Sequence, residues 1–166
     1  MEFGECKQCG RSLVLSRRGA RFCSPKCRVY WHRSVSRIPA DLTSRHTWVR
    51  AAGKRPLTPG GRAASSTDAA TWSTFAAVRS SEAGDGFGIM LGGGLGCYDL
   101  DHVTDVEARE FAASIPERIV FAERSMSGRG VHIFVEAPEA RGWRRGNVER
   151  YTRARFIRMT GARFTL

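Results

Sequence analysis

The sequence predicts an α+β fold, in which a mixed or antiparallel sheet with helices on one side follows a small cysteine-containing module. After a leading helix, the predicted elements follow the order β-β-α-β-β-β, which favours one such sheet. Four of the five cysteines lie within the first 35 residues. The 166 residues provide enough chain for one domain of ordinary size and one small module.

The leading helix and the first two strands are expected within residues 65–101. Residues 65–80 open with Ser, Thr and Asp, which are favoured at a helix N-cap, and then space apolar residues at helical intervals. Residues 87–101 predict a strand, a tight glycine turn at 92–94 and a second strand, which together form a hairpin.

The remaining segments predict one more helix and several strands. Residues 105–116 have the pattern of a short amphipathic helix that Pro116 ends. Residues 118–123 and 130–136 predict two strands joined by a loop. Residues 148–164 predict a final hairpin or strand pair.

Three segments can be separated along the chain. Residues 1–35 form the cysteine module. Residues 36–66 contain three prolines and a Gly-Gly pair, which predict a mostly irregular basic connector and the start of the next domain. Residues 67–166 form the compact core of that domain, which we expect to carry the main function.

Basic residues dominate two parts of the chain. The 27 Lys and Arg residues outnumber the 16 acids, which gives a formal net charge of +11. Between Cys6 and Thr67 there are 14 Lys or Arg and one acid, and from Arg141 to Arg163 there are eight Arg and one acid. Guanidinium groups bind phosphates bidentately and stack on bases, so this distribution favours nucleic acid as a partner. A solvated basic surface is the alternative interpretation.

No segment has the features of an export signal or a membrane span. The first residues lack a basic region followed by an apolar one, and no apolar run approaches the roughly 20 residues that cross a bilayer. We therefore expect a soluble intracellular protein with no membrane partner.

The four N-terminal cysteines have the spacing of metal ligands. Cys6 and Cys9 form one closely spaced pair, and Cys23 and Cys27 form another. Two such pairs can place four thiolates around one zinc ion in a structural site. Two disulfides are the alternative, which the absence of an export signal disfavours. The basic residues beside the module favour a role in binding nucleic acid or protein over a purely structural role, and of these partners they favour nucleic acid.

Two aspartates, Asp99 and Asp101, lie in a predicted strand that is otherwise apolar. Residues two apart on a strand project the same way, so we expect both carboxylates on one face. Two desolvated like charges are costly unless a cation compensates them, and Mg²⁺ is commonly held by one or two carboxylates and substrate phosphates. Separate salt bridges are the alternative.

A glycine-containing loop and a third acid follow these aspartates. Ser127, Arg129 and the neighbouring glycines offer a hydroxyl, a guanidinium and open backbone N–H groups, which suit a triphosphate. His132 follows on the next predicted strand, where a packed histidine after a plain hairpin turn is the alternative. Glu149 supplies the third carboxylate that a site with two metal ions needs, although ordinary ion pairing also explains it.

The motifs YDLD, SGRGVHIF and VERY, the last followed by RFIRMTG, occur in an order that resembles the three motifs of the archaeo-eukaryotic primase superfamily. The resemblance is especially to the primase-polymerase (prim-pol) domains of phage and plasmid replication proteins, and it covers roughly residues 48–163. It implies a sheet similar to that of RNA-recognition motifs. It also implies that a pair of Mg²⁺ or Mn²⁺ ions is held by catalytic acids, which are Asp99, Asp101 and Glu149.

The same resemblance implies the residues that contact substrate. The second motif is a small-residue loop that leads to a nucleotide-binding histidine. The nucleotide-binding residues are then Ser127, Arg129 and His132, to which Arg158 is added as a further phosphate contact. In the segment that leads to these motifs, the residues that face phosphate or template are Lys54 and Arg55.

The function implied by the resemblance is DNA-templated nucleotidyl transfer, in which a 3′-hydroxyl attacks a nucleoside triphosphate to synthesise or extend primers. The implied partners are a single-stranded DNA template, nucleoside triphosphates and a separate replicative helicase, in the cytoplasm of a bacterium or of a phage-infected host. The alternative is a non-catalytic zinc-containing DNA-binding protein, a replication accessory or regulator whose acids are structural. A rolling-circle nuclease ranks lowest, because the sequence contains no His-x-His pair.

Overall fold

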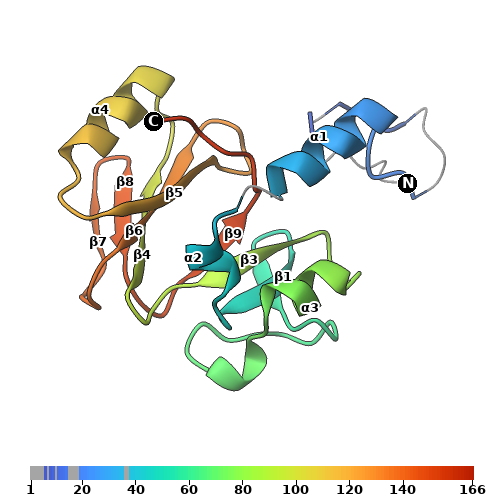
Figure 1. The fold of residues 1–166 in the computed structure, drawn as a ribbon, viewed down its shortest axis with the longest axis horizontal. Helices are drawn as coiled ribbons and strands as arrows, with labels where there is room; N and C mark the ends of the chain where they lie inside the picture. The colour runs from blue at the N-terminus through green and yellow to red at the C-terminus, as the bar shows by residue number, and fades with distance from the viewer. Residues whose placement is uncertain (1–5, 7, 10, 15–18, 36–37) are drawn as a thin grey trace. The chain divides into compact units, whose positions relative to one another are not determined.

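The computed structural model describes residues 6, 8–9, 11–14, 19–35 and 38–166. The chain divides into two compact units, Met1–Arg37 and Ile38–Leu166. In the first unit, helix α1 (Pro25–Val35) begins two residues after Cys23 and contains Cys27 in its first turn (Figure 1).

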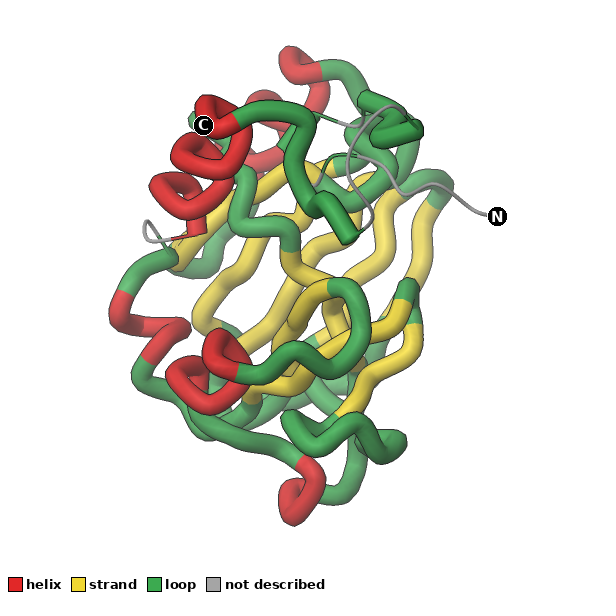
Figure 2. The backbone as a smooth tube through the Cα atoms, turned by 90° about the vertical axis from the view of Figure 1, so that its right-hand side faces the viewer, coloured by secondary structure: helices red, strands yellow, loops and turns green. Residues whose placement is uncertain are grey.

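The second unit contains two antiparallel sheets, whose strands are drawn in yellow in Figure 2. The four-stranded sheet has the order β2-β1-β3-β9, and the five-stranded sheet has the order β5-β6-β4-β8-β7. The strands of the first sheet are β1 (Trp48–Ala52), β2 (Arg55–Leu57), β3 (Gly86–Met90) and β9 (Phe156–Met159). The strands of the second sheet are β4 (Leu95–Leu100), β5 (Ile119–Arg124), β6 (Val131–Glu136), β7 (Trp143–Arg145) and β8 (Val148–Tyr151).

Short helices flank these sheets. The second unit contains α2 (Ala40–Thr43), α3 (Phe75–Ser80) and α4 (Asp105–Ser114). A capping box starts α4, because Thr104 Oγ1 accepts from the Glu107 N–H while the Glu107 carboxylate accepts from the Thr104 N–H. Among the described residues, no helix is both long enough and apolar enough to cross a membrane.

Helix α4 covers one face of the five-stranded sheet (Figure 1). Its buried alanines pack in one hydrophobic cluster with Tyr98 and Leu100 of β4 and with Ile133 of β6. Because successive strand residues point to opposite faces, Asp99 projects away from α4. The other face of this sheet is therefore the one that can carry a polar site.

Aromatic rings form the core beside the four-stranded sheet. The fully buried ring of Trp48 lies 4.6 Å from the ring of Phe75 on α3 and 5.9 Å from that of Phe87 on β3. The indole Nε1–H donates to the Leu42 carbonyl at 2.9 Å, so the buried polar group of Trp48 has a partner. These contacts join β1, β3, α2 and α3 into one packed layer.

The predicted α+β class with antiparallel pairing is confirmed, but the strands form two sheets and not one. Strands β3 and β4, predicted as a hairpin, belong to different sheets. All three glycines at 92–94 have positive φ, so this turn redirects the chain from one sheet to the other. Strands β8 and β9 also belong to different sheets, and β8 pairs with β7, a three-residue strand that sequence reasoning missed.

Residues 36–66 are predicted to be a mostly irregular connector; the described part of this segment also contains α2, β1 and β2, which belong to the second unit. Trp48 and Val49 of β1 are fully buried, as the strand lies second from the edge of its sheet. Pro56 is accommodated because β2 is the edge strand, where the absence of one N–H is tolerated.

The helix predicted over residues 65–80 is interrupted. A short 3₁₀ helix (Ala69–Thr71) and α3 are separated by residues 72–74. The backbone N–H of Ser73 donates to the Trp48 carbonyl at 2.8 Å, and the Trp48 N–H donates back at 3.0 Å. This pairing with β1 uses the backbone groups of Ser73 that a continuous helix would need.

Candidate active site and metal centre

The four cysteines of the first unit converge on one point. Their sulfur atoms all lie within 4.8 Å of one another, and none of the four forms a disulfide. Cys23 Sγ lies 3.6 Å from the sulfurs of Cys9 and Cys27, which are 3.8 Å apart. Sulfurs about 2.3 Å from a zinc ion at tetrahedral corners would be about 3.8 Å apart. The spacing therefore fits zinc and contradicts the disulfide alternative.

Two of these thiols have shifted acidities. Burial raises the pKa of the Cys6 thiol. Hydrogen bonds from backbone N–H groups, of which that of Cys23 is the strongest, lower the pKa by more, so that the net value is about 6. Hydrogen bonding to the Cys27 and Cys9 thiols raises the pKa of Cys23 to about 12. Four thiolates this close together need a compensating cation. With four sulfur ligands a zinc site has no open position, so its role would be structural.

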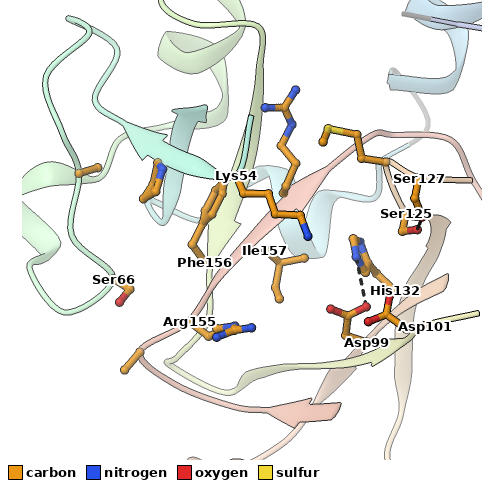
Figure 3. Close-up of a pocket in the computed structure, with 15 residues that line it drawn as sticks. Lys54, Ser66, Asp99, Asp101, Ser125, Ser127, His132, Arg155, Phe156 and Ile157 are labelled. Carbon is orange, nitrogen blue, oxygen red and sulfur yellow. Dashed lines mark hydrogen bonds and ion pairs between the residues drawn. The ribbon is translucent and has the colours of Figure 1, made fainter. Parts of the chain in front are cut away.

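A pocket of about 650 Å³ lies in the second unit and is lined by residues from both sheets. Asp99 of β4, Asp101 just after β4 and His132 of β6 form one side, together with the loop after β5. Strand β9 and Lys54, in the turn between β1 and β2, form the other side. Figure 3 shows Lys54 and Arg155 extending toward the two aspartates.

Strand pairing places Asp99 between two other predicted site residues. Asp99 lies opposite His132 on β6 and opposite Glu149 on β8. Residues directly opposite each other on antiparallel strands project from the same face. These three residues therefore form one row across the sheet, and Asp101 follows just beyond the end of β4.

The acidity of Asp99 reflects this crowding. Burial raises the pKa of its carboxyl group above the usual value. His132 opposes this effect, while the charges of Asp101 and Glu149 add to it. Acids that disfavour one another's ionisation are compensated by a bound cation, and oxygen ligands beside room for phosphate suit Mg²⁺ or Mn²⁺.

Glu149 belongs to the row, but its carboxylate is engaged by other side chains. It accepts a hydrogen bond from Tyr151 Oη at 2.8 Å, and it lies 3.3 Å from Arg144 Nη1 and 3.6 Å from Arg155 Nη2. Glu149 does not line the pocket. In the part of the chain that the structure describes, the cysteines converge to within 4.8 Å and the three acids do not.

His132 is buried between two carboxylates. Its Nε2 atom lies 3.6 Å from Asp99 Oδ1 (Figure 3), and its Nδ1 atom lies 3.1 Å from Glu123 Oε1. Burial lowers the pKa of His132, but the hydrogen bond to Glu123 and the charge of Asp99 raise it by more. The ring can thus carry a positive charge at the pocket wall, where it would attract phosphate oxygens.

The loop between β5 and β6 presents two hydroxyl groups to the pocket. Ser125 and Ser127 both line it, and their Oγ atoms are 3.1 Å apart. A side chain at Gly130 would place a Cβ atom 2.5 Å from the Leu100 carbonyl oxygen, so this position requires glycine. Arg129 is exposed and does not line the pocket, so its contact with nucleotide stays a prediction.

The predicted basic residues are placed differently from one another. Lys54 lines the pocket and Arg55 does not. Arg158 lines it as well, but its Nη1 donates to Asp85 Oδ1 at 2.6 Å and to the Gly53 carbonyl at 2.7 Å. The charge of Arg158 is therefore already paired within the fold.

Sequence reasoning missed Glu123 and Arg155. Arg155 lines the pocket, and its guanidinium carbon lies 4.3 Å from the ring centroid of Tyr151. It is one of eight arginines between 141 and 163, so no local signal distinguishes it. Glu123 did leave a signal, since it follows four consecutive apolar residues of β5; the structure shows it fully buried.

Comparison with known proteins agrees with the motif order. Comparison with curated proteins returns no match. The family model Prim-Pol, described as bifunctional DNA primase/polymerase, N-terminal, matches residues 28–162. This region contains both sheets and the whole pocket. Because the match spans most of the chain and confirms the resemblance seen in the motifs, the chain belongs to the Prim-Pol family of DNA primase/polymerases.

Proposed function

We propose that this Prim-Pol domain is a DNA-templated nucleotidyltransferase that synthesises or extends primers. The observation that carries the proposal is the composition of the pocket, where Asp99, Asp101 and His132 face Lys54 and Arg155 across about 650 Å³. A cavity of this size is typical of small-molecule sites. Acidic groups on one side and basic groups on the other suit a triphosphate that carries divalent ions.

The triphosphate would lie against the loop after β5. The hydroxyl groups of Ser125 and Ser127 and the ring of His132 would donate hydrogen bonds to phosphate oxygens. Lys54 and Arg155 would neutralise charge from the opposite wall. Arg129 and Arg158 would join them as further phosphate contacts only by leaving their present positions.

Asp99, Asp101 and Glu149 would hold a pair of Mg²⁺ or Mn²⁺ ions. Such ions would activate the attacking 3′-hydroxyl and stabilise charge on the leaving pyrophosphate. Asp99 is fixed by its place in β4, between two paired strands. Glu149 would exchange its contacts with Arg144 and Arg155, whose side chains are 68% and 46% exposed, for a metal ion. The Glu149 side chain is itself 16% exposed, so the exchange would move the two exposed arginine side chains and not the strand that carries Glu149.

Single-stranded template would bind the basic surfaces. Lys54 and Arg55 lie in and after the turn that borders the pocket. In the first unit, α1 exposes Lys26, Arg28 and Tyr30, and Lys26 Nζ lies 5.7 Å from the centroid of the Tyr30 ring. An exposed aromatic ring among cations is suited to stack on a base while the cations contact phosphate. The cysteine module would thus bind DNA.

The proposal can be tested with purified protein, single-stranded template, labelled nucleotides and Mg²⁺ or Mn²⁺, with and without a primer. The Asp99→Ala/Asp101→Ala protein should make no product, while it retains its zinc and its affinity for DNA. Glu117→Gln is the matched control, because Glu117 accepts from Tyr98 Oη and Arg150 on the opposite face of the same sheet. Product from the control but not from the double variant would support the catalytic role of the aspartates.

A second candidate is a non-catalytic DNA-binding protein of the same fold. One observation favours it, which is that arginine contacts hold the third acid and the three carboxylates do not converge within the described residues. In that case wild type and the double aspartate variant would be equally inert and would bind DNA equally well. A separate helicase partner stays a prediction under both candidates.

A further inference from the structure

We infer that Glu123 is a positioning residue, which fixes the ring of His132 and determines which ring nitrogen faces the nucleotide. The inference rests on the proposed function, because it concerns the same pocket. Glu123 does not line that pocket, so it would act on the nucleotide only through His132. It would therefore support the site without being a catalytic residue.

Strand register places Glu123 at one end of the polar row. Glu123 of β5 lies opposite His132 of β6, which lies opposite Asp99 of β4, which lies opposite Glu149 of β8. Four neighbouring strands therefore each contribute one polar residue to the same face. Glu123 is the most deeply buried member, with an exposed fraction of 0%.

The carboxylate of Glu123 is surrounded by hydrogen-bond donors. The Gly161 N–H donates to Oε2 at 2.8 Å, and the Thr160 N–H lies 3.2 Å from both oxygens. His132 Nδ1 lies 3.1 Å from Oε1. Backbone N–H groups can only donate, so the Glu123 carboxylate is the acceptor in these contacts and His132 Nδ1 is assigned as one more donor to it. The Nδ1 atom therefore carries the proton and donates it to Glu123.

This hydrogen bond leaves Nε2 for the pocket. Nε2 lies 3.6 Å from Asp99 Oδ1, which is longer than a hydrogen bond, so this nitrogen faces the pocket and, in the positively charged ring, its N–H can donate to a phosphate oxygen. Turning the ring over would place a carbon against a fully buried carboxylate and remove one of its hydrogen bonds, which is costly. Glu123 thus holds the ring in one orientation before any nucleotide arrives.

The competing explanation is purely structural, since Glu123 also ties the Thr160-Gly161 segment to β5. Both explanations predict that substitution of Glu123 lowers the melting temperature. Stability alone cannot separate them. The two explanations differ in whether the effect of Glu123 on nucleotide affinity depends on the His132 ring.

A double-mutant cycle on nucleotide affinity provides this measurement. The probe is a fluorescent deoxynucleoside triphosphate with Mg²⁺, and the proteins are wild type, Glu123→Gln, His132→Ala and the double variant. We expect Glu123→Gln to raise the Kd about tenfold, by analogy with the hydrogen-bond partners of metal-ligating histidines, whose loss costs about 10–100-fold. In the His132→Ala background the same substitution should change the Kd less than about twofold, by the logic of the cycle. Glu117→Gln should leave the Kd unchanged. An equal loss in both backgrounds, or no loss in either, would overturn the inference.

A second readout does not depend on nucleotide binding. The ¹⁵N chemical shifts of the His132 ring in the full chain should report a protonated Nδ1 in wild type. In Glu123→Gln the side-chain oxygen must face the Gly161 N–H, so the NH₂ group faces Nδ1, which should lose its proton. An unprotonated Nδ1 in wild type would contradict the inference, even if the variant does not fold.

The two readouts separate failure of the inference from failure of the proposed function. A wild-type protein that binds no nucleotide would contradict the proposed function, and the ring shifts would still decide whether Glu123 orients His132. A wild-type protein that binds nucleotide and makes product, with an unprotonated Nδ1, would overturn the inference alone.

Discussion

The cysteine cluster and the row of acids are both candidate metal sites, yet the chain assembles them over very different separations in sequence. The cysteines come from two short segments near the N-terminus, and their sulfurs already have a spacing that fits zinc. The acids come from β4 and β8, which meet only through strand pairing. Glu149 remains in contact with arginines, and among the described residues the three acids do not converge as the cysteines do.

The difference indicates how far the folding of each unit depends on a bound ion. Among the described residues of the first unit, the buried apolar side chains are Cys6 and Leu13, so this unit lacks a sizeable core of its own. Zinc would supply much of its stability. The second unit has extensive buried cores, so its sheet holds Asp99 in place whether or not an ion is bound.

Removal of zinc has the largest expected effect. Chelation should unfold the first unit, because structural zinc contributes about 10–16 kcal/mol in comparable small modules. Amide NMR spectra recorded before and after chelation would check this, and the signals of the second unit should persist. If the first unit keeps its dispersed signals without zinc, its folding does not depend on the ion, and the proposed difference between the two units is wrong.

Gly130→Ala should damage the second site and spare the first. The added Cβ would lie 2.5 Å from the Leu100 carbonyl oxygen, which forces β6 and the end of β4 apart at a cost of about 1–3 kcal/mol. Thermal denaturation and zinc analysis would show a lower melting temperature with full zinc content. Unchanged stability would mean that the two strands can separate freely at this point.

Asp99→Asn should stabilise the metal-free protein at neutral pH. The folded state raises the pKa of Asp99 above 3.8, mainly through burial, so the native state binds this proton more tightly than the unfolded state does. Stability from Asp99 is therefore present at low pH and is lost as pH rises through the raised pKa. Melting temperatures measured from pH 3 to pH 8 should diverge in favour of the variant as pH increases. A variant that is less stable than wild type at pH 8 would contradict this sign.

Arg144→Ala should have the smallest effect of these changes. It tests directly whether an arginine competes with a metal ion for Glu149. The Arg144 side chain is 68% exposed and lies 3.3 Å from Glu149 Oε1, so its removal takes away one of the contacts of the third acid and leaves those with Arg155 and Tyr151. Because exposed ion pairs are worth up to about 1 kcal/mol, Mn²⁺ affinity should rise by no more than about fivefold. Titration calorimetry would measure this change. Weaker Mn²⁺ binding would mean that Arg144 supports the acids and does not compete with the ion.

The cysteine site was predictable because its geometry is local. Spacing within two short segments was enough to identify the four cysteines that converge. The shared side of Asp99 and Asp101 was also predictable, because alternation along one strand determines it, and both residues line the pocket.

Long-range pairing was not predictable from the sequence. Glu123 becomes the partner of His132 only through the register between β5 and β6. The glycine turn at 92–94 was recognised, but its positive φ angles are compatible with a hairpin or with a change of sheet. Trp48 packs against Phe75 of α3 and Phe87 of β3, which stabilises β1 and β3 in a sheet separate from β4. Contacts between residues this far apart in sequence cannot be derived from local patterns.

The most direct test of the proposed site is a crystal structure of the full chain with Mn²⁺ and a non-hydrolysable nucleoside triphosphate, with anomalous data collected for manganese and zinc. We predict manganese at Asp99 and Asp101, triphosphate oxygens at Ser127 and His132, and zinc among the four cysteines. Manganese absent from the aspartates while nucleotide is bound elsewhere would contradict the proposed active site.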